Sequence, residues 1–173
     1  SAYIDGDFTT ATVHDTSTST TALNLSGGTI TTLRILGGTG TVNIASDCTL
    51  NTTVEQIGAT GVATVIPDGT TIGGSATLTM DSGRMELNQA VPTIMVFGGN
   101  LESTLDSGTV TLLEQYGGNI RWTPSAASTI TTLTLYSGVF DSRESTAPSF
   151  TITNSTIHTG AILDERSGLE NAV

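Results

Sequence analysis

The amino-acid sequence predicts an all-β protein, a single-domain parallel β-helix (β-solenoid) of about six to seven short coils. Three observations favour this fold: a short unit recurs along the chain, apolar residues alternate within each unit, and a glycine turn lies in its middle. The 173 residues suffice for one domain with a buried core. No long helix is expected, because Ala, Leu, Glu and Lys are nowhere concentrated together.

The repeat is visible in two stretches, ITTLRILGG from Ile30 and ITTLTLYSG from Ile130. Between Leu33 and Leu133 the unit recurs with a mean period of about 20 residues, which is typical of a solenoid. Leu33 and Leu133 should therefore occupy the same position in two coils, five coils apart. The intervening copies are VEQIGATGVATV from Val54, which is degenerate, LTMDSGRMEL from Leu78, IMVFGGNLES from Ile94 and LLEQYGGNIRW from Leu112.

Alternation with period two predicts strands that bury one face. In the first strand of a unit, the expected inward pairs include Leu33 with Ile35 and Val110 with Leu112. In the second strand they are Val42/Ile44, Met85/Leu87 and Ile120/Trp122. Sharp bends with positive φ are expected at the turn glycines. These are Gly38, Gly58, Gly83, Gly98, Gly117 and Gly138.

A β-sandwich is the alternative fold, since it also uses many short strands. A sandwich does not require one unit at a fixed period, so the solenoid is favoured. We divide the chain into an N-terminal arm or cap (residues 1–20), the solenoid (residues 21–163), and a C-terminal cap or docking tail (residues 164–173). The ends of an open solenoid expose unpaired strand edges, which need a cap or a partner.

The outward positions of the first strands form a Thr-x-Thr array. Its members are Thr32 with Arg34, Thr77 with Thr79, Thr93 with Met95, Thr109 with Thr111, Thr132 with Thr134, and Thr151 with Thr153. Stacked threonines pack well between parallel strands, and this is the interpretation we favour. An ice-binding face is the functional alternative, although Arg34 and Met95 interrupt the array.

The outward positions of the second strands carry charge. Glu86, Glu102, Arg121 and Asp141 lie there, and Glu102, Arg121 and Asp141 should fall on successive coils with alternating sign. The functional alternative is the cleft of a polysaccharide lyase, for which Glu102, Asp141, Arg143 and Glu144 are the candidate residues. The short loops of this sequence argue against such a cleft.

The charge of the chain limits its partners. The formal net charge is −11, and all five basic residues are Arg. Nucleic acid requires clustered cations, and an anionic membrane would repel the chain, so neither is an expected partner. Cys48 is expected to be a small buried thiol. The N-terminal residues are polar and acidic, so no signal peptide is expected, and the opening Ser-Ala suggests a cytoplasmic product whose initiator Met has been removed.

We assign no catalytic, cofactor-binding or metal-binding residues. The sequence DGD from Asp5 to Asp7 resembles the start of a calcium loop, but the remaining ligand spacing does not follow it. His14 and His158 have no partner at metal-ligand spacing, and both are expected to be spectators. Trp122 is expected to fill the core.

Three phrases, GGTITTLRILGGTGTVNI, TITTLTLYSGVFDSRES and AILDERSGLENAV, resemble a group of tailed-bacteriophage virion proteins built from Thr/Gly-rich rungs. This resemblance covers roughly residues 20–170. It implies a non-catalytic capsid decoration (cement) protein that binds the major capsid protein and neighbouring copies of itself, as a homo-oligomer on the virion, after synthesis in the host cytoplasm.

Two other functions remain open at this stage. One is a tail-fibre or surface adhesin that binds glycans, with Tyr116, Tyr136 and Trp122, where exposed, as stacking platforms for sugars. The other is the small polysaccharide lyase described above.

Overall fold

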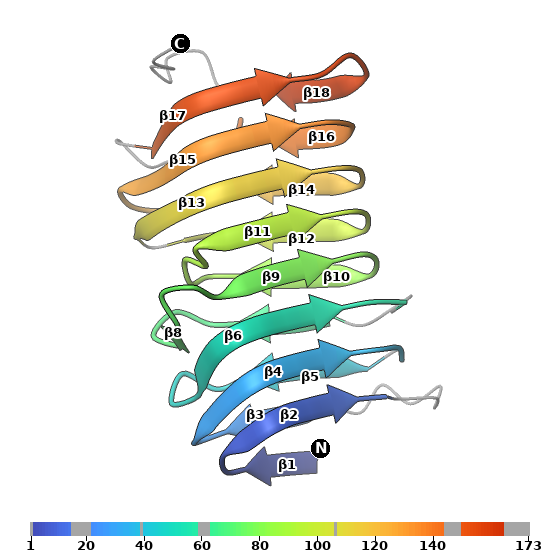
Figure 1. Ribbon diagram of the computed structural model, residues 1–173, viewed down its shortest axis with the longest axis vertical. Coiled ribbons are helices and arrows are strands. Elements are labelled where there is room, and N and C mark those ends of the chain that lie inside the picture. Colours follow the sequence, from blue (N-terminus) through green and yellow to red (C-terminus); the bar gives the residue numbers. More distant parts are fainter. Residues whose placement is uncertain are drawn as a thin grey trace.

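The computed structural model describes residues 2–14, 22–38, 40–58, 63–105, 107–143 and 150–164. They form two facing sheets of parallel strands, wound as stacked coils with β1 and β18 at opposite ends of the stack (Figure 1). Every strand pair is parallel, so the predicted single-domain β-solenoid is confirmed and the β-sandwich is excluded. The described residues contain no helix long and apolar enough to cross a membrane.

Sheet I contains the strands on one side of the stacked coils. In order they are β1 (Ala2–Asp5), β3 (Leu23–Ser26), β5 (Thr41–Ile44), β7 (Ala63–Ile66), β10 (Arg84–Leu87), β12 (Asn100–Ser103), β14 (Asn119–Trp122), β16 (Gly138–Asp141) and β18 (Ala161–Asp164).

Sheet II contains the opposing strands, several of which are longer and curved (Figure 1). In order they are β2 (Phe8–Val13), β4 (Thr29–Ile35), β6 (Thr49–Gln56), β9 (Thr77–Met80), β11 (Thr93–Val96), β13 (Gly108–Gln115), β15 (Ser128–Leu135) and β17 (Phe150–Ile157), with β8 (Thr71–Ile72) paired to β6.

The register confirms the equivalence of Leu33 and Leu133. Successive strands of sheet II align one inward column through five steps. That column runs Leu33, Val54, Leu78, Ile94, Leu113, Leu133, and all six side chains are buried. The repeated sequence thus reflects one position of a coil, occupied each time by a side chain that leaves water.

The core lies between the two sheets and is almost entirely aliphatic. The expected inward pairs of sheet I, including Met85/Leu87 and Ile120/Trp122, are all buried. Trp122 is fully buried and its ring lies 6.3 Å from that of Phe140, which confirms its predicted place in the core. Cys48 is also confirmed as a buried thiol: its Sγ donates to the carbonyls of Leu25 and Gly27, each at 3.3 Å, and burial raises its pKa.

Two predictions within the long strands were wrong. Val110 is buried, but its inward partner is Leu113, not Leu112, because two consecutive residues (Thr111 and Leu112) lie outside where the strand turns a corner. For the same reason Thr109 aligns with Thr129, and it is Leu112 that shares a column with Thr93 and Thr132. A strict two-residue alternation fails wherever a strand bends around the edge of the core.

The glycine turns are mostly where they were expected. Gly83 and Gly138 have φ of 80° and 91°, but in two other turns the second glycine, not the first, takes the positive angle. Gly99 and Gly118, with φ of 80° and 73°, do so in place of Gly98 and Gly117. Only glycine fits there, since a Cβ on Gly118 would lie 2.5 Å from the carbonyl oxygen of Gly99 in the preceding coil.

The first residues of the chain take part in the stack. Residues 1–20 were predicted to be an arm or cap, yet β1 pairs with β3 and β2 pairs with β4 in the same parallel register as the later coils. The paired strands therefore begin before residue 21. At the other end, β18 reaches Asp164, and residues 165–173 of the predicted C-terminal cap or tail lie outside the described residues.

Candidate functional site

The most distinctive surface feature is a column of four stacked rings, here called the aromatic ladder: Phe97, Tyr116, Tyr136 and His158. Ring centroids are 4.7 Å apart for Phe97 and Tyr116, 4.6 Å for Tyr116 and Tyr136, and 4.7 Å for Tyr136 and His158. Neighbouring planes differ by only 6°, 8° and 14°. The three carbocyclic rings are 38–45 % exposed, although the chain is only 5 % aromatic. A rare residue class is thus concentrated on one surface edge.

The local fold explains the alignment. Each ring belongs to the residue immediately after β11, β13, β15 or β17, just before the turn to the next strand. The backbone N–H of Tyr116 donates to the carbonyl of Val96 at 2.7 Å, and that of Tyr136 donates to Gln115 at 2.8 Å. These bonds extend the ladder of sheet II by one residue, so the spacing of the rings equals the spacing of the coils.

The stacking decides which part of each ring a partner can reach. The faces of Tyr116 and Tyr136 cover one another and those of their neighbours, so the exposed parts are ring edges and hydroxyls. The Tyr116 hydroxyl donates to Glu114 Oε2 at 3.3 Å. The pKa of the Tyr116 phenol is raised, first by partial burial and second by the negative charge of Glu114. Sugars stack on free ring faces, whereas edges suit aliphatic groups or the faces of other aromatic rings. Ring edges and hydroxyls, rather than the faces of Tyr116 and Tyr136, are therefore what this surface presents.

The structure shows where the three aromatic residues proposed to bind glycans lie. Tyr116 and Tyr136 are exposed and adjacent in the ladder, but Trp122 is buried and cannot meet a sugar. Phe97 and His158 were not among the predicted aromatic surface residues, and His158 was expected to be a spectator. Their signal was present, because the ring directly precedes a glycine-containing turn in four consecutive units, FGG, YGG, YSG and HTG.

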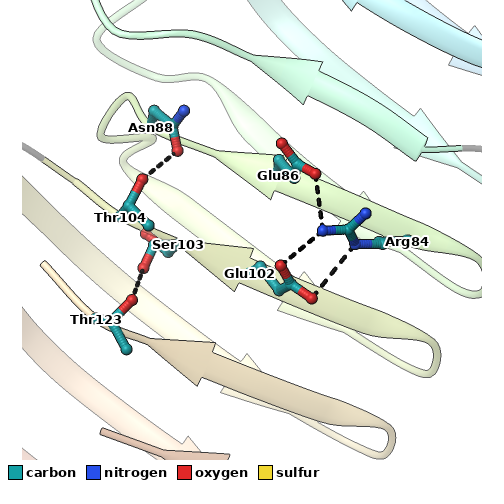
Figure 2. Close-up of polar contacts among 7 residues, drawn as sticks. All are labelled: Arg84, Glu86, Asn88, Glu102, Ser103, Thr104 and Thr123. Carbon is teal, nitrogen blue, oxygen red and sulfur yellow. Dashed lines mark hydrogen bonds and ion pairs between the residues drawn. The ribbon is translucent and has the colours of Figure 1, made fainter. Parts of the chain in front are cut away.

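A second feature is a charged ladder on the outer face of sheet I. Glu86 pairs in register with Glu102, Glu102 with Arg121, and Arg121 with Asp141, which confirms the predicted alternation from Glu102 to Asp141. Figure 2 shows Arg84 between the two glutamates, with its Nη2 2.8 Å from Glu86 Oε1 and 2.8 Å from Glu102 Oε2. The arginine offsets the repulsion that two stacked carboxylates would otherwise have.

Smaller polar contacts continue the pattern beside this ladder (Figure 2). The Thr104 hydroxyl donates to Asn88 Oδ1 at 2.6 Å, and the Thr123 hydroxyl donates to the Ser103 carbonyl at 3.2 Å. Each bond joins one coil to the next, so the outer face of sheet I is held together by contacts between coils as well as by the backbone ladder.

The candidate lyase residues do not form a poised acid or base. Arg143 holds the pKa of Asp141 down to about 2 through a side-chain bond at 2.8 Å, and Arg84 lowers the pKa of Glu102. Glu102 and Asp141 are separated by the coil that carries Arg121. A general acid working near neutral pH needs a raised carboxyl pKa, the opposite of what is found here. Glu144 lies outside the described residues.

The remaining candidates have structural surroundings. Asp7 Oδ1 accepts a bond from the Thr29 backbone N–H at 2.6 Å, so this carboxylate joins the first two coils. His14 is exposed at the end of β2, and His158 is part of the aromatic ladder. Among the described residues no group of three His, Cys, Asp or Glu side chains could hold a metal ion.

The Thr array has a different membership from the one predicted. One outward column of sheet II contains Thr10, Thr32, Thr53, Thr77, Thr93, Leu112, Thr132 and Asn154. The neighbouring column includes the ion pair of Arg34 with Glu55, whose Nε and Oε2 are 2.7 Å apart. This ion pair, Met95 and Glu114 interrupt the second column, so an uninterrupted two-column Thr face does not form.

The fold and the two ladders define the chain as a parallel β-solenoid with aligned surface side chains. No protein-family model matches it, and no curated protein or solved structure matches it either.

Proposed function

We propose that this chain is a non-catalytic structural protein of a tailed-bacteriophage particle, which binds the outer surface of the major capsid lattice and stabilises it. The resemblance of its Thr/Gly-rich rungs to phage virion proteins supports the class of particle. The observation that carries the proposal of a protein partner is the aromatic ladder, an exposed column of four stacked rings on a chain whose net charge is −11.

The ladder has the properties of an interaction hot spot. Aromatic residues are enriched at the cores of protein interfaces, while surface glutamate and aspartate are depleted there. Because the rings already stack on one another within the free protein, little side-chain entropy is lost on binding. The partner surface should offer aliphatic groups or aromatic faces to the ring edges of Tyr116 and Tyr136.

The charged ladder supports a scaffold role rather than a catalytic one. Its carboxylates are paired with Arg84 on β10 and with Arg143 just after β16, and the pKa of Glu102 and that of Asp141 are lowered. The Arg84–Glu102 and Arg143–Asp164 pairs link neighbouring coils, and the net charge of −11 favours solubility before a docking site exists.

Co-sedimentation with phage heads tests the proposal. Heads assembled without this chain should bind the purified wild-type protein saturably, in a fixed ratio to the capsid subunits. Replacing Tyr116 and Tyr136 by Ser should weaken binding at least about 30-fold, the loss of roughly 2 kcal/mol expected at a hot spot. The matched control is Tyr3→Ser, which removes an exposed tyrosine outside the ladder and should bind like the wild type.

Two results would contradict the proposal. One is a wild-type protein that does not sediment with heads at any concentration, and the other is binding that is confined to tails or to isolated glycans. Equal binding by the Tyr116→Ser/Tyr136→Ser variant and the Tyr3→Ser control would separately exclude the aromatic ladder as the contact.

A further inference from the structure

We infer that copies of this chain associate end to end, with β1 and β2 of one copy continuing sheets I and II beyond β18 and β17 of the next. The ligand of each end is thus a second copy of the same chain. This inference does not depend on the capsid as a partner.

Both ends of the described stack present sheet edges. β1 and β18 are the outermost strands of sheet I, and β2 and β17 are the outermost strands of sheet II along the path of paired strands (Figure 1). At these ends, side chains in core-facing columns are exposed. Ile4 is 40 % exposed although its neighbour Leu25 is buried, and Ile157 is 47 % exposed although its neighbour Leu135 is buried.

One column shows how the two ends match. It starts at Val13 in β2 and ends at Ile157 in β17, and the six residues between them are completely buried. Those six are Ile35, Gln56, Met80, Val96, Gln115 and Leu135. A second copy placed one coil further along the axis would set its Val13 on Ile157 and cover both apolar side chains.

The neighbouring positions are compatible with the same placement. The column that holds Thr12 ends at Thr156, so threonine would meet threonine on the outer face. The column that holds Ala11 ends at Ser155, so two small side chains would meet inside. No two like charges are brought together on sheet II by this contact.

The composition of β2 and β17, the two end strands of sheet II, supports pairing. Soluble proteins protect exposed edges with charged residues, proline or bulges. β2 reads FTTATV and β17 reads FTITNSTI, and neither contains a charge, a proline or a glycine, although the whole chain carries a net charge of −11. The end strands of sheet I each carry one carboxylate, Asp5 in β1 and Asp164 in β18, so the two uncharged edges of sheet II are the ones left able to accept another strand.

The geometry favours a head-to-tail contact over a symmetric one. Every strand pair among the described residues is parallel, and adding one more parallel coil repeats the contact already made seven times between Val13 and Ile157. Joining two like ends would instead pair strands antiparallel and lose the column matches. Head-to-tail contacts are heterologous, so they produce open chains of copies rather than closed dimers.

Disulfide trapping tests the contact directly. In the full chain, Val13→Cys and Ile157→Cys would lie in adjacent parallel strands of two copies, with Cα atoms about 4.8 Å apart, within the range that a disulfide spans. Within one copy the two positions are seven steps apart, about 34 Å, and cannot bond. Mild oxidation of the double variant should therefore give a ladder of covalent dimers, trimers and longer chains.

Single variants and a shifted pair serve as controls. Each single cysteine variant should stop at dimers, and Val13→Cys/Ser155→Cys, which shifts the second cysteine by two residues, should cross-link at least tenfold more slowly. Dimers of the Val13→Cys single variant that form as fast as the products of the double variant would show a symmetric contact and overturn the inference.

Sedimentation velocity of unmodified protein gives an independent measurement. The wild type should show concentration-dependent growth beyond dimers. Ile157→Lys, which places a charge in the inward column, should remain monomeric, while Ile162→Lys, which places the same charge on the outer face of β18, should still associate. A wild type that stays monomeric up to millimolar concentration, together with no ladder from the double cysteine variant, would refute end-to-end association.

Discussion

Three glycines allow the energetic cost of close coil stacking to be separated into its parts. Gly118 has φ of +73°, and a Cβ there would lie 2.5 Å from the Gly99 carbonyl oxygen and 2.8 Å from the Gly98 carbonyl carbon. Gly160 also has positive φ, +99°, but a Cβ would meet nothing within 4 Å. Gly74 has neither constraint. The Ala variants of these three positions form a matched series.

The expected loss of stability differs between the Ala variants. Gly160→Ala should cost about 1–2 kcal/mol, the penalty for a left-handed non-glycine residue. Gly118→Ala has that penalty and must also move the backbone of the coil beneath by several tenths of an ångström. This movement weakens the bond from the Asn119 N–H to the Gly99 carbonyl, 2.9 Å in the native protein, for about 1 kcal/mol more. The total should be roughly 2–3 kcal/mol.

Thermal unfolding followed by circular dichroism provides the assay. For a chain of this size 1 kcal/mol corresponds to roughly 2–4 °C, so Gly118→Ala should lower Tm by about 4–12 °C. Gly160→Ala should lower it by less. Gly74→Ala should leave Tm unchanged or raise it slightly, because alanine reduces the entropy of the unfolded chain. If Gly118→Ala and Gly74→Ala unfolded at the same temperature, the argument from close backbone contact between coils would be refuted.

Two further perturbations test the core and the charged ladder. Trp122→Ala should destabilise the protein by about 3–5 kcal/mol, because it empties a fully buried site beside Phe140. Trp122→Phe should cost less than half as much, since the indole Nε1 has no hydrogen-bond partner to lose; equal costs in urea unfolding would argue against a packing role. The pKa of Asp141, lowered from 3.8 to about 2, should contribute stability that is present above pH 4 and lost as the pH falls to 2. Asp141→Asn and Arg143→Gln should both flatten that part of the stability–pH curve, and a curve that coincides with that of the wild type would show that this pair is not the cause.

The sequence by itself determined the solenoid and its main register. The period of about 20 residues, the alternating apolar pairs and the glycine turns were sufficient to place Leu33 and Leu133 in one column and to align Glu102, Arg121 and Asp141 on successive coils. These features are local, because a strand that buries one face alternates apolar and polar residues. Each stacked coil then repeats that alternation.

Only the tertiary structure decided what happens at the corners and the edges. Coils differ in length, so the residue that pairs with Thr109 in the next coil depends on where each strand bends. That residue is Thr129. The aromatic ladder could not be predicted for the same reason. Phe97, Tyr116, Tyr136 and His158 lie on coils with different numbers of residues, and their alignment depends on how those coils stack. Likewise, within the predicted N-terminal arm or cap (residues 1–20), β1 and β2 pair with β3 and β4, because a neighbouring coil supplies the edge on which they stack. Contacts between coils, rather than patterns within them, determine these positions.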